Sequence, residues 1–320
     1  MILPYYLRLL CLCLATFFVV HVMLWLGVRA VSGAVVRVAE NMRPRSASRF
    51  LFALRLAPAV ASLFVVVGFC VPSYVWLEPN LAVERVGWVC LLAAVLGAAG
   101  WTASLWRGLA ALGRTRQFVR RSETASAPAS DLLVVESPTA VMALAGVFRP
   151  RLVVSQRVLQ ALSSEQQEAA FRHEAAHRTS RDNLKKLAVL LTPDALPWLG
   201  GLGRLERAWA RFTEWAADDE AVDGDQQRAL SLASALVLVA KLGVSPVPAY
   251  LLVTLLDDDS DLKLRVDRLL REPACAEKPL APQVAIGRNL TVVAGSVAVT
   301  LLLWPESLGG VHRLLERLVQ

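Results

Sequence analysis

The chain has little charge for its size. Charged residues make up 19% of its 320 positions, hydrophobic residues make up 55%, and the mean hydropathy is +0.48. A soluble domain normally carries more charge and less apolar residue than this. The balance therefore indicates a membrane protein with a polar part attached, in which a few membrane spans accompany one domain of about 100 to 200 residues.

Paired cysteines are also missing. Of the five cysteines, Cys11, Cys13, Cys70 and Cys90 lie inside apolar runs, where a small buried hydrophobic residue is the simplest interpretation. Cys275 stands alone in REPACAEKP. Because no CxxC or other paired spacing occurs, the sequence predicts neither a disulfide framework nor a thiolate zinc site.

A single basic face is not apparent either. The net charge is +7, which can indicate nucleic-acid binding, but the arginines flank apolar stretches. We interpret them as membrane topology signals, and we expect no nucleic-acid partner.

Long apolar runs are present. About 20 mostly apolar residues are needed to cross a bilayer. The runs Leu9–Val28, Leu56–Leu77 and Val86–Trp106 meet this length, so residues 1–106 are predicted to form three transmembrane helices. A shorter run, Asn289–Trp304, predicts a fourth helix over 281–305, and residues 306–320 would then form a short extracytoplasmic tail.

The arginines predict the sidedness of these spans. Five arginines and one acidic residue, Glu40, lie between positions 29 and 50, and five more arginines closely follow the third span. The positive-inside rule places the 29–50 loop and the segment after the third span in the cytoplasm, with the N-terminus outside. We therefore expect a multi-pass protein of the cell inner (cytoplasmic) membrane, with the lipid bilayer as a partner. His21, inside the first span, is interpreted as a packing residue with a hydrogen-bond partner.

A soluble domain is predicted over residues 132–280. It follows a juxtamembrane linker at 107–131, whose last part reads SETASAPASD. Short β-branched runs at 132–137, 143–148 and 151–155 predict two or three strands. They could form a covering hairpin, or an edge strand that accepts an extended peptide.

Two of the only four histidines lie in the sequence HEAAH, at His173 and His177. Ser163 and Gln166 form the pattern of a capping box and begin a strongly helical stretch that contains both. Residues four apart share a helix face, so the two imidazoles can bind one Zn²⁺. Glu174 lies beside them and can take a proton from a zinc-bound water, which makes it the candidate catalytic base. A chance match remains the alternative for so short a motif.

A third ligand is needed for a catalytic zinc site, and no cysteine lies nearby. Glu214 and Asp218 share a face of a second predicted helix over 206–218. Glu214 can complete a site of two histidines and one glutamate, with one Zn²⁺ per chain. Asp218 can hold a ligand histidine by its other ring nitrogen. The alternative is an exposed acidic helix.

The order of these motifs resembles a known family. Three spans precede FRPRLVVS (148–155), HEAAH, Arg181-Asp182-Asn183, the Glu214/Asp218 pair and a last span. This is similar to integral-membrane zinc peptidases of the BlaR/MecR antirepressor type, gluzincins related to HtpX-like and CAAX-prenyl-protease-like peptidases. The resemblance covers roughly residues 1–305, with its specific core at 145–222.

The resemblance implies a mostly α membrane protein with about four transmembrane helices and a cytoplasmic α+β gluzincin domain with a small β-sheet. It implies His173, His177 and Glu214 as ligands and Glu174 as base. Unlike β-lactam receptors of this family, the tail after Trp304 carries no Ser-x-x-Lys motif, so the chain resembles a relative without the penicillin-binding sensor domain. Some gluzincins stabilise the oxyanion with a further histidine.

The cytoplasmic segment offers no further histidine for the oxyanion. Arg207, Arg211 or Tyr250 would have to serve, and Arg211 ranks first because it is closest to Glu214. The expected function is a zinc metalloendopeptidase that cleaves a cytoplasmic or juxtamembrane protein, such as a transcriptional repressor in a signalling pathway. A separate sensor or repressor protein is a candidate partner. The alternative is a non-catalytic signalling scaffold or receptor with a structural or vestigial zinc site.

Overall fold

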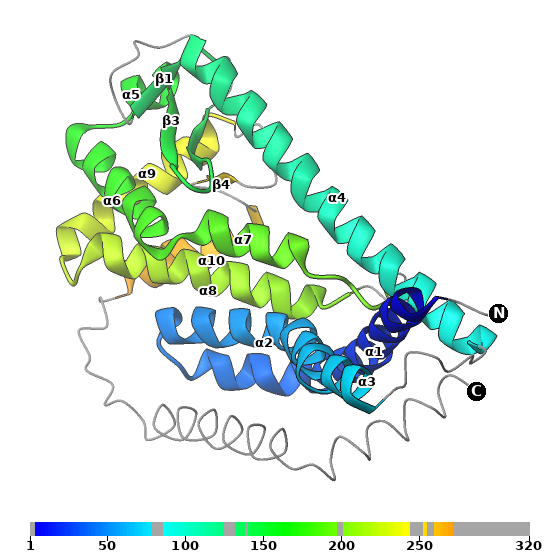
Figure 1. Cartoon of the computed structure of the whole chain (residues 1–320). Coiled ribbons are helices and arrows are strands. Elements are labelled where there is room, and N and C mark those ends of the chain that lie inside the picture. Colours follow the sequence, from blue (N-terminus) through cyan, green and yellow to red (C-terminus); the bar gives the residue numbers. More distant parts are fainter. Residues whose placement is uncertain are drawn as a thin grey trace.

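The structure is largely helical, with one small sheet at the far end of a long helix (Figure 1). It is a computed structural model that describes residues 4–77, 86–124, 132–137, 140–196, 201–243, 252–254 and 259–271. The fourth predicted span and the tail lie outside the described residues.

Within the described residues, three helical segments are long and apolar enough to cross a membrane: Tyr5–Glu40, Pro44–Trp76 and Trp88–Ser122. The first is α1 (Tyr5–Glu40). The second joins α2 (Pro44–Val65), a π-helical turn η1 (Val66–Cys70) and α3 (Val71–Leu77). The third is α4 (Trp88–Thr124) without its last two residues. Their lengths and composition indicate that the chain associates with a membrane.

These helices extend beyond the predicted spans. Residues 29–40 belong to α1, and only residues 41–43 separate α1 from α2, so most of the expected basic loop at 29–50 is helical. The break falls at Arg43, since a residue before proline avoids the helical conformation and Pro44 suits a first helical position. Likewise, α4 continues through residues 107–124 of the expected linker. A fall in hydropathy shows where the apolar stretch ends. The backbone stays helical beyond that point, until a residue that disfavours the helix is reached.

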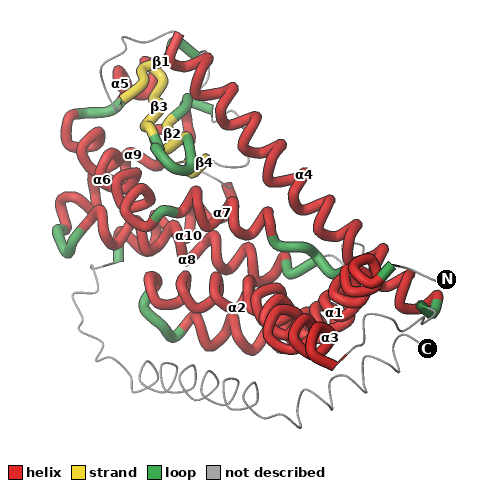
Figure 2. Tube along the Cα trace, in the orientation of Figure 1, coloured by secondary structure: helices red, strands yellow, loops and turns green. Residues whose placement is uncertain are grey.

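The sheet contains four strands: β1 (Leu132–Val135), β2 (Met142–Ala145), β3 (Arg151–Ser155) and β4 (Leu252–Thr254). The strands lie together in one sheet (Figure 2), in the order β1-β3-β2-β4. Strands β1 and β3 are parallel, and β2 runs antiparallel to both β3 and β4. The three predicted strands are confirmed. The sequence did not predict β4, which pairs with β2 and leaves β1 and β4 as the edges.

The described part of the domain also contains the helices α5 (Gln156–Ala161), α6 (Ser164–Ser180), α7 (Asp182–Leu191), α8 (Gly203–Val222), α9 (Gln226–Lys241) and α10 (Asp259–Leu270). The capping box that begins α6 is confirmed, since the Gln166 backbone N–H donates to the Ser163 side chain and the Ser163 N–H donates to the Gln166 side chain. Buried Leu232 and Leu236 of α9 pack with Val154 of β3 in the main core. This core holds α6 in place beneath the sheet.

A polar cluster joins the long helices to the segment after α7. Asp194 accepts hydrogen bonds from Arg55 Nη2 of α2 and Arg107 Nη1 of α4, each at 2.8 Å. Arg55 Nε also donates to Glu206 of α8 at 2.6 Å. We call these four residues the Asp194 cluster. Nearby, the Nε2 atom of buried His21 lies 3.0 Å from the Pro193 carbonyl oxygen, as expected for a packing histidine with a partner. Helix α8 lies along α2, so the domain rests on the long helices (Figure 1).

Candidate metal centre

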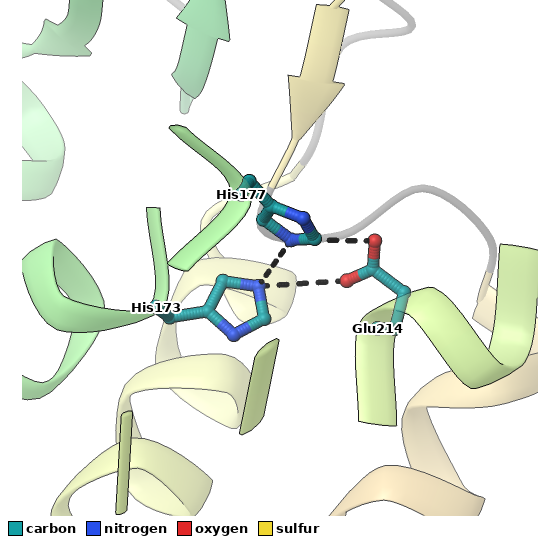
Figure 3. Close-up of side chains that lie close together, drawn as sticks. All are labelled: His173, His177 and Glu214. Atoms are coloured by element: carbon teal, nitrogen blue, oxygen red, sulfur yellow. Dashed lines mark hydrogen bonds and ion pairs between the residues drawn. The ribbon is translucent and has the colours of Figure 1, made fainter. Parts of the chain in front are cut away.

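Two helices bring His173, His177 and Glu214 together (Figure 3). The histidines share one face of α6, and Glu214 projects from α8. The two Nε2 atoms are 3.1 Å apart, His173 Nε2 is 3.5 Å from Glu214 Oε2, and His177 Nε2 is 3.6 Å from Glu214 Oε1. All three side chains are buried, and their ligand atoms lie within 4.8 Å of one another. The group has the size and the donor atoms to hold a metal ion.

The opposite nitrogen of each imidazole faces a carboxylate. His173 Nδ1 is 2.9 Å from Asp218 Oδ1, and His177 Nδ1 is 2.8 Å from Asp182 Oδ2. A carboxylate in this position fixes the ring proton on Nδ1 and leaves Nε2 as a lone-pair donor. The two Nε2 lone pairs would then face each other beside the Glu214 carboxylate. These donors repel one another unless a metal ion or a proton lies between them, which is the physical argument for a metal site.

The turn after α6 supplies Asp182. Arg181 has the left-handed conformation, with φ 54° and ψ 43°, so the chain reverses and α7 begins immediately. A left-handed non-glycine residue is uncommon and is often found where function requires it. The reversal returns Asp182 to His177, and Lys185 Nζ donates to the other oxygen of Asp182 at 2.7 Å. The Asn183 amide donates to the backbone oxygens of Leu144 and Gly146 at the end of β2. Sequence reasoning noted this tripeptide but gave it no role.

Arg265 of α10 is the residue that sequence reasoning missed. Its guanidinium is buried and donates to both oxygens of Asp218, at 2.7 and 2.9 Å, and lies 3.0 Å from Glu214 Oε2. Its Nη2 atom is also 3.5 Å from His173 Nε2. In the sequence, Arg265 is one of several basic residues in LKLRVDRLL, and nothing local distinguishes it. Only the packing of α10 against α8 and α9 brings it to the centre.

Burial and neighbouring charges have opposite effects on the pKa values of the side chains at this centre. Burial disfavours the Asp218 carboxylate, but Arg265 and His173 outweigh it and lower the pKa of Asp218 to about 2. Burial also disfavours the charged His177 ring, yet Glu214 and Asp182 outweigh it and raise the pKa of His177 to about 10. The pKa of Glu214 is held well below its usual range by His177 and Arg265 despite its burial. The donors therefore favour any positive charge among them, a proton or a metal ion.

Glu174 differs from the other carboxylates. Its side chain is 1% exposed, and neither carboxylate oxygen has a hydrogen-bond partner among the described residues. Burial raises the pKa of Glu174 to about 7, although His173 and His177 partly oppose the shift. A buried polar group without a partner is costly and calls for an explanation. A carboxyl group with a pKa near neutrality can both accept and return a proton.

Arg211 lies elsewhere. Its Nη2 atom is 3.3 Å from Glu40 Oε1 of α1, and its guanidinium stacks over the rings of Phe212 and Trp215. Within the part of the chain that the structure describes, these contacts of Arg211 lead to α1 and to its own helix, away from the histidines and Glu214. The guanidinium that does reach the centre is that of Arg265, so a role for Arg211 stays a prediction without geometric support. Tyr250 lies outside the described residues.

Comparisons with models of protein families, with curated proteins and with solved structures find no match to this chain. The resemblance to BlaR/MecR-type peptidases thus stays a prediction from its motifs.

Proposed function

We propose that the protein is a membrane-associated, zinc-dependent endopeptidase that cleaves a cytoplasmic or juxtamembrane protein. One observation carries the proposal: a buried His173, His177 and Glu214 group with the unpartnered carboxylate of Glu174 in the same helix turn as His173. A structural metal site has no need of a buried, unpaired carboxylate, whereas hydrolysis needs a base.

The donor set favours zinc over other common metals. Two imidazole nitrogens and one carboxylate are a recurrent ligand set of catalytic zinc sites, which leave a fourth position open. Calcium and magnesium prefer all-oxygen surroundings. The chemistry supplied by a bound zinc ion is Lewis-acid activation of water and of the peptide carbonyl.

The chain's own residues would complete the reaction. Glu174 accepts the proton of the attacking water at its carboxylate and later returns it to the leaving amine, because it is buried beside the histidines and has no other hydrogen-bond partner among the described residues. Asp218 and Asp182 keep the two imidazoles in the tautomer that donates through Nε2. Arg265 pairs with Asp218 and lies close to Glu214. Its positive charge lets the Asp218 carboxylate stay ionised beside the Glu214 carboxylate.

The spans and arginine pattern support a cytoplasmic site near the membrane. We therefore infer a protein or peptide substrate, with a repressor of transcription as one candidate and a separate sensor protein as another possible partner. No nucleic-acid contact is proposed, since the arginines are explained by topology and by ion pairs.

The deciding experiment compares Glu174→Gln with the wild-type protein. We expect the variant to keep about one zinc per chain and to lose proteolysis, measured as the loss of cleavage products when membrane and cytoplasmic proteomes are compared. The matched control is Glu168→Gln on the same helix, where the side chain is exposed and pairs with Arg172. If the Glu174→Gln variant still cleaves protein substrates, the proposed mechanism is wrong.

A second function has one observation in its favour. The guanidinium of Arg265 already brings positive charge to Glu214 and His173, as it could in a signalling scaffold with a vestigial site. In that case the protein purified without chelators would contain no zinc, and Glu174→Gln would leave its cellular effect unchanged.

A further inference from the structure

The ends of the three apolar runs mark the level of the lipid boundary on the structure. The first run ends at Val28 on α1, the second begins at Leu56 on α2, and the third ends at Trp106 on α4. An arginine flanks each of these ends, at positions 29, 55 and 107. Because the backbone is helical through all three positions, the distance of a residue from the boundary can be counted along each helix at about 1.5 Å per residue.

The turn after α7 lies below this boundary. The Pro193 carbonyl oxygen is 3.0 Å from Nε2 of His21, which lies seven residues inside the end of the first run. A Cβ added to Gly100, six residues inside the end of the third run, would lie 3.7 Å from Pro193 Cβ. Both helices therefore place Pro193 about 9 to 10 Å inside the hydrocarbon when they stand along the membrane normal. Pro193 is buried, as non-helical backbone at this depth must be.

The residues that follow are held at the boundary itself. Asp194 accepts hydrogen bonds from Arg55 and Arg107, the arginines that flank the second and third runs. Arg29, which follows the first run, donates from Nη1 to the Gly201 carbonyl oxygen at 3.1 Å. All three flanking arginines thus bind the connection between α7 and α8, which agrees with a common boundary level.

Helix α7 limits the height of the metal centre above the boundary. It begins at Asp182, which contacts His177, and Pro193 lies eleven residues further along the chain. Nine helical steps and two extended residues cover at most about 20 Å. Since Pro193 lies about 9 to 10 Å below the boundary, Asp182 lies no more than about 10 Å above it.

Helix α2 gives a second measure of the same height. The Ser48 and Thr213 hydroxyl oxygens are 2.7 Å apart, and Thr213 precedes Glu214 on α8. Ser48 lies eight residues before Leu56, which corresponds to about 12 Å along α2. Both routes place the centre about 10 Å from the hydrocarbon, just beyond the headgroup layer of about 5 to 8 Å.

We propose that the centre cleaves the segment of a membrane-anchored polypeptide that emerges from the bilayer, at a bond about three to six residues beyond the end of its span. An extended chain covers about 3.3 Å per residue, so three residues are enough to reach the centre and a few more allow for an indirect path. The inference rests on the proposed peptidase function and names its substrate class. The reaction is hydrolysis, in which water supplies the hydroxyl group of the new carboxyl group and a proton of the new amine.

Anchoring favours such a segment over a soluble protein. The lipid surface limits how closely a folded protein in solution can approach a centre at this height, whereas a chain that leaves the bilayer has to pass this height. A shared membrane also raises the effective concentration of the segment. We therefore expect anchoring to increase the rate of cleavage at least about tenfold.

The test uses the full chain with zinc in nanodiscs of phosphatidylethanolamine and phosphatidylglycerol. The probe is a single span of leucine and alanine followed by four copies of the sequence AFKLS, so that each type of bond recurs at four heights. Mass spectrometry should show cleavage about three to six residues from the span, and the four copies without a span should be cleaved at least about tenfold more slowly. Glu174→Gln shows which cleavage depends on the centre.

A rigid spacer separates the effect of height from that of sequence. Two EAAAK repeats between the span and the first copy add about 15 Å and should reduce cleavage of the first copy at least about fivefold. Undiminished cleavage of that copy would contradict selection by height. Equal rates for the anchored and the soluble probe, both lost in Glu174→Gln, would overturn the substrate class and leave the peptidase function standing. If neither probe is cleaved in a Glu174-dependent way, the peptidase function and the inference both fail.

The height of the centre can be measured without activity. A nitroxide is attached to a ketone-bearing amino acid at Thr179, an exposed residue two positions after His177, in nanodiscs that contain nickel-chelating lipid. The matched control is Gln160, an exposed residue of α5, which lies beside the far end of α4 (Figure 1). We expect nickel to relax the nitroxide at 179 more strongly than the one at 160. Equal relaxation at both sites would overturn the inference even if the peptidase is active.

Discussion

The centre is built from donors that favour a positive charge among them, either a proton or a metal ion. His173 and His177 point their Nε2 atoms at each other, and a carboxylate oxygen lies within 2.9 Å of the Nδ1 atom of each ring. A residue that only filled space would not require this double support. The two supporting carboxylates differ in their own partners, since Asp218 is neutralised by Arg265 and Asp182 by Lys185.

The support of His173 predicts a loss of metal affinity. Asp218→Asn removes the charge that orients Nδ1 and leaves Arg265 partly unpaired, so we expect zinc affinity to fall about 10- to 100-fold. Competition with a zinc chelator measures the change. Asp219→Asn is the control, because Asp219 pairs with Arg268 away from the histidines and should leave affinity unchanged. Equal losses in both variants would contradict the role of Asp218.

The raised pKa of His177 predicts that zinc and protons compete. With a pKa of about 10 the ring is protonated in the metal-free protein at neutral pH, so binding must release that proton. Zinc affinity should rise about tenfold per pH unit between pH 7 and 9. Titration calorimetry in buffers of different ionisation enthalpy counts the protons released. An affinity that does not change with pH would show that His177 is already neutral.

The raised pKa of His177 also makes the stability of the metal-free protein depend on pH. The folded pKa of His177 is raised above its unfolded value near 6.5, so its contribution is complete below about pH 6.5 and is lost as pH rises through about 10. We expect the melting temperature without metal to fall over this range, and to fall less with zinc bound. Thermal unfolding in detergent at several pH values measures both.

The sequence predicted the residues that the structure brings together at the centre, because they follow local rules. Two histidines one helix turn apart, a capping box, and an acidic pair on the next helix can all be read from spacing. Arg265 and the link from Asp182 to His177 could not be predicted in this way. Arg265 reaches Asp218 across 47 positions of sequence, and Asp182 is placed by a left-handed turn at Arg181 that the residue type does not announce.

At the scale of elements, α7 and the segment after it connect two polar groups. The first residue of α7, Asp182, contacts His177, and Asp194 beyond its other end binds Arg55 and Arg107 of the long helices. The centre and the long helices are thus joined by one short helix. The sequence of this stretch does not reveal the link, because the partners of Asp194 lie far away in the chain, on α2 and α4.

The Asp194 cluster predicts that replacing one carboxylate by an amide lowers the stability of the fold. Asp194→Asn leaves Glu206 as the remaining carboxylate partner of the buried Arg55 and weakens the link to Arg107. We therefore expect the free energy of unfolding to fall by about 1 to 3 kcal/mol. Chemical or thermal unfolding in detergent measures it. Asp223→Asn makes the same chemical change at a side chain that is 81% exposed and should alter stability by less than about 0.5 kcal/mol. A neutral result at Asp194 would mean that the cluster is solvated.

At the scale of the whole molecule, the number of spans in the described chain was easier to predict than their lengths. Apolar runs reveal where a helix can enter a bilayer. They do not reveal that α1 and α4 continue through arginine-rich sequence, because arginine is itself a good helix former. The helices therefore continue into the stretches assigned to a loop and a linker.

The arginine pattern predicts the sidedness of the chain. An alkaline phosphatase fusion after Met42 should be inactive, since that turn is expected in the cytoplasm, whereas a fusion after Leu81 should be active. Fluorescent protein fusions at the same points should give the reverse. If the phosphatase is active at Met42, the inferred orientation is wrong, and the metal centre would face the other side.

The length of α4 has a consequence for reach. At 1.5 Å per residue its 37 residues extend about 55 Å, about 25 Å more than the hydrocarbon core of a bilayer. The sheet is attached near the protruding end, at Phe118 and Val119. If the apolar part of α4 crosses the bilayer along its normal, the length of the helix fixes the distance between the sheet and the lipid surface. An extended chain covers about 3.3 Å per residue, so a membrane-anchored protein would need a tether of about eight residues to span the same height.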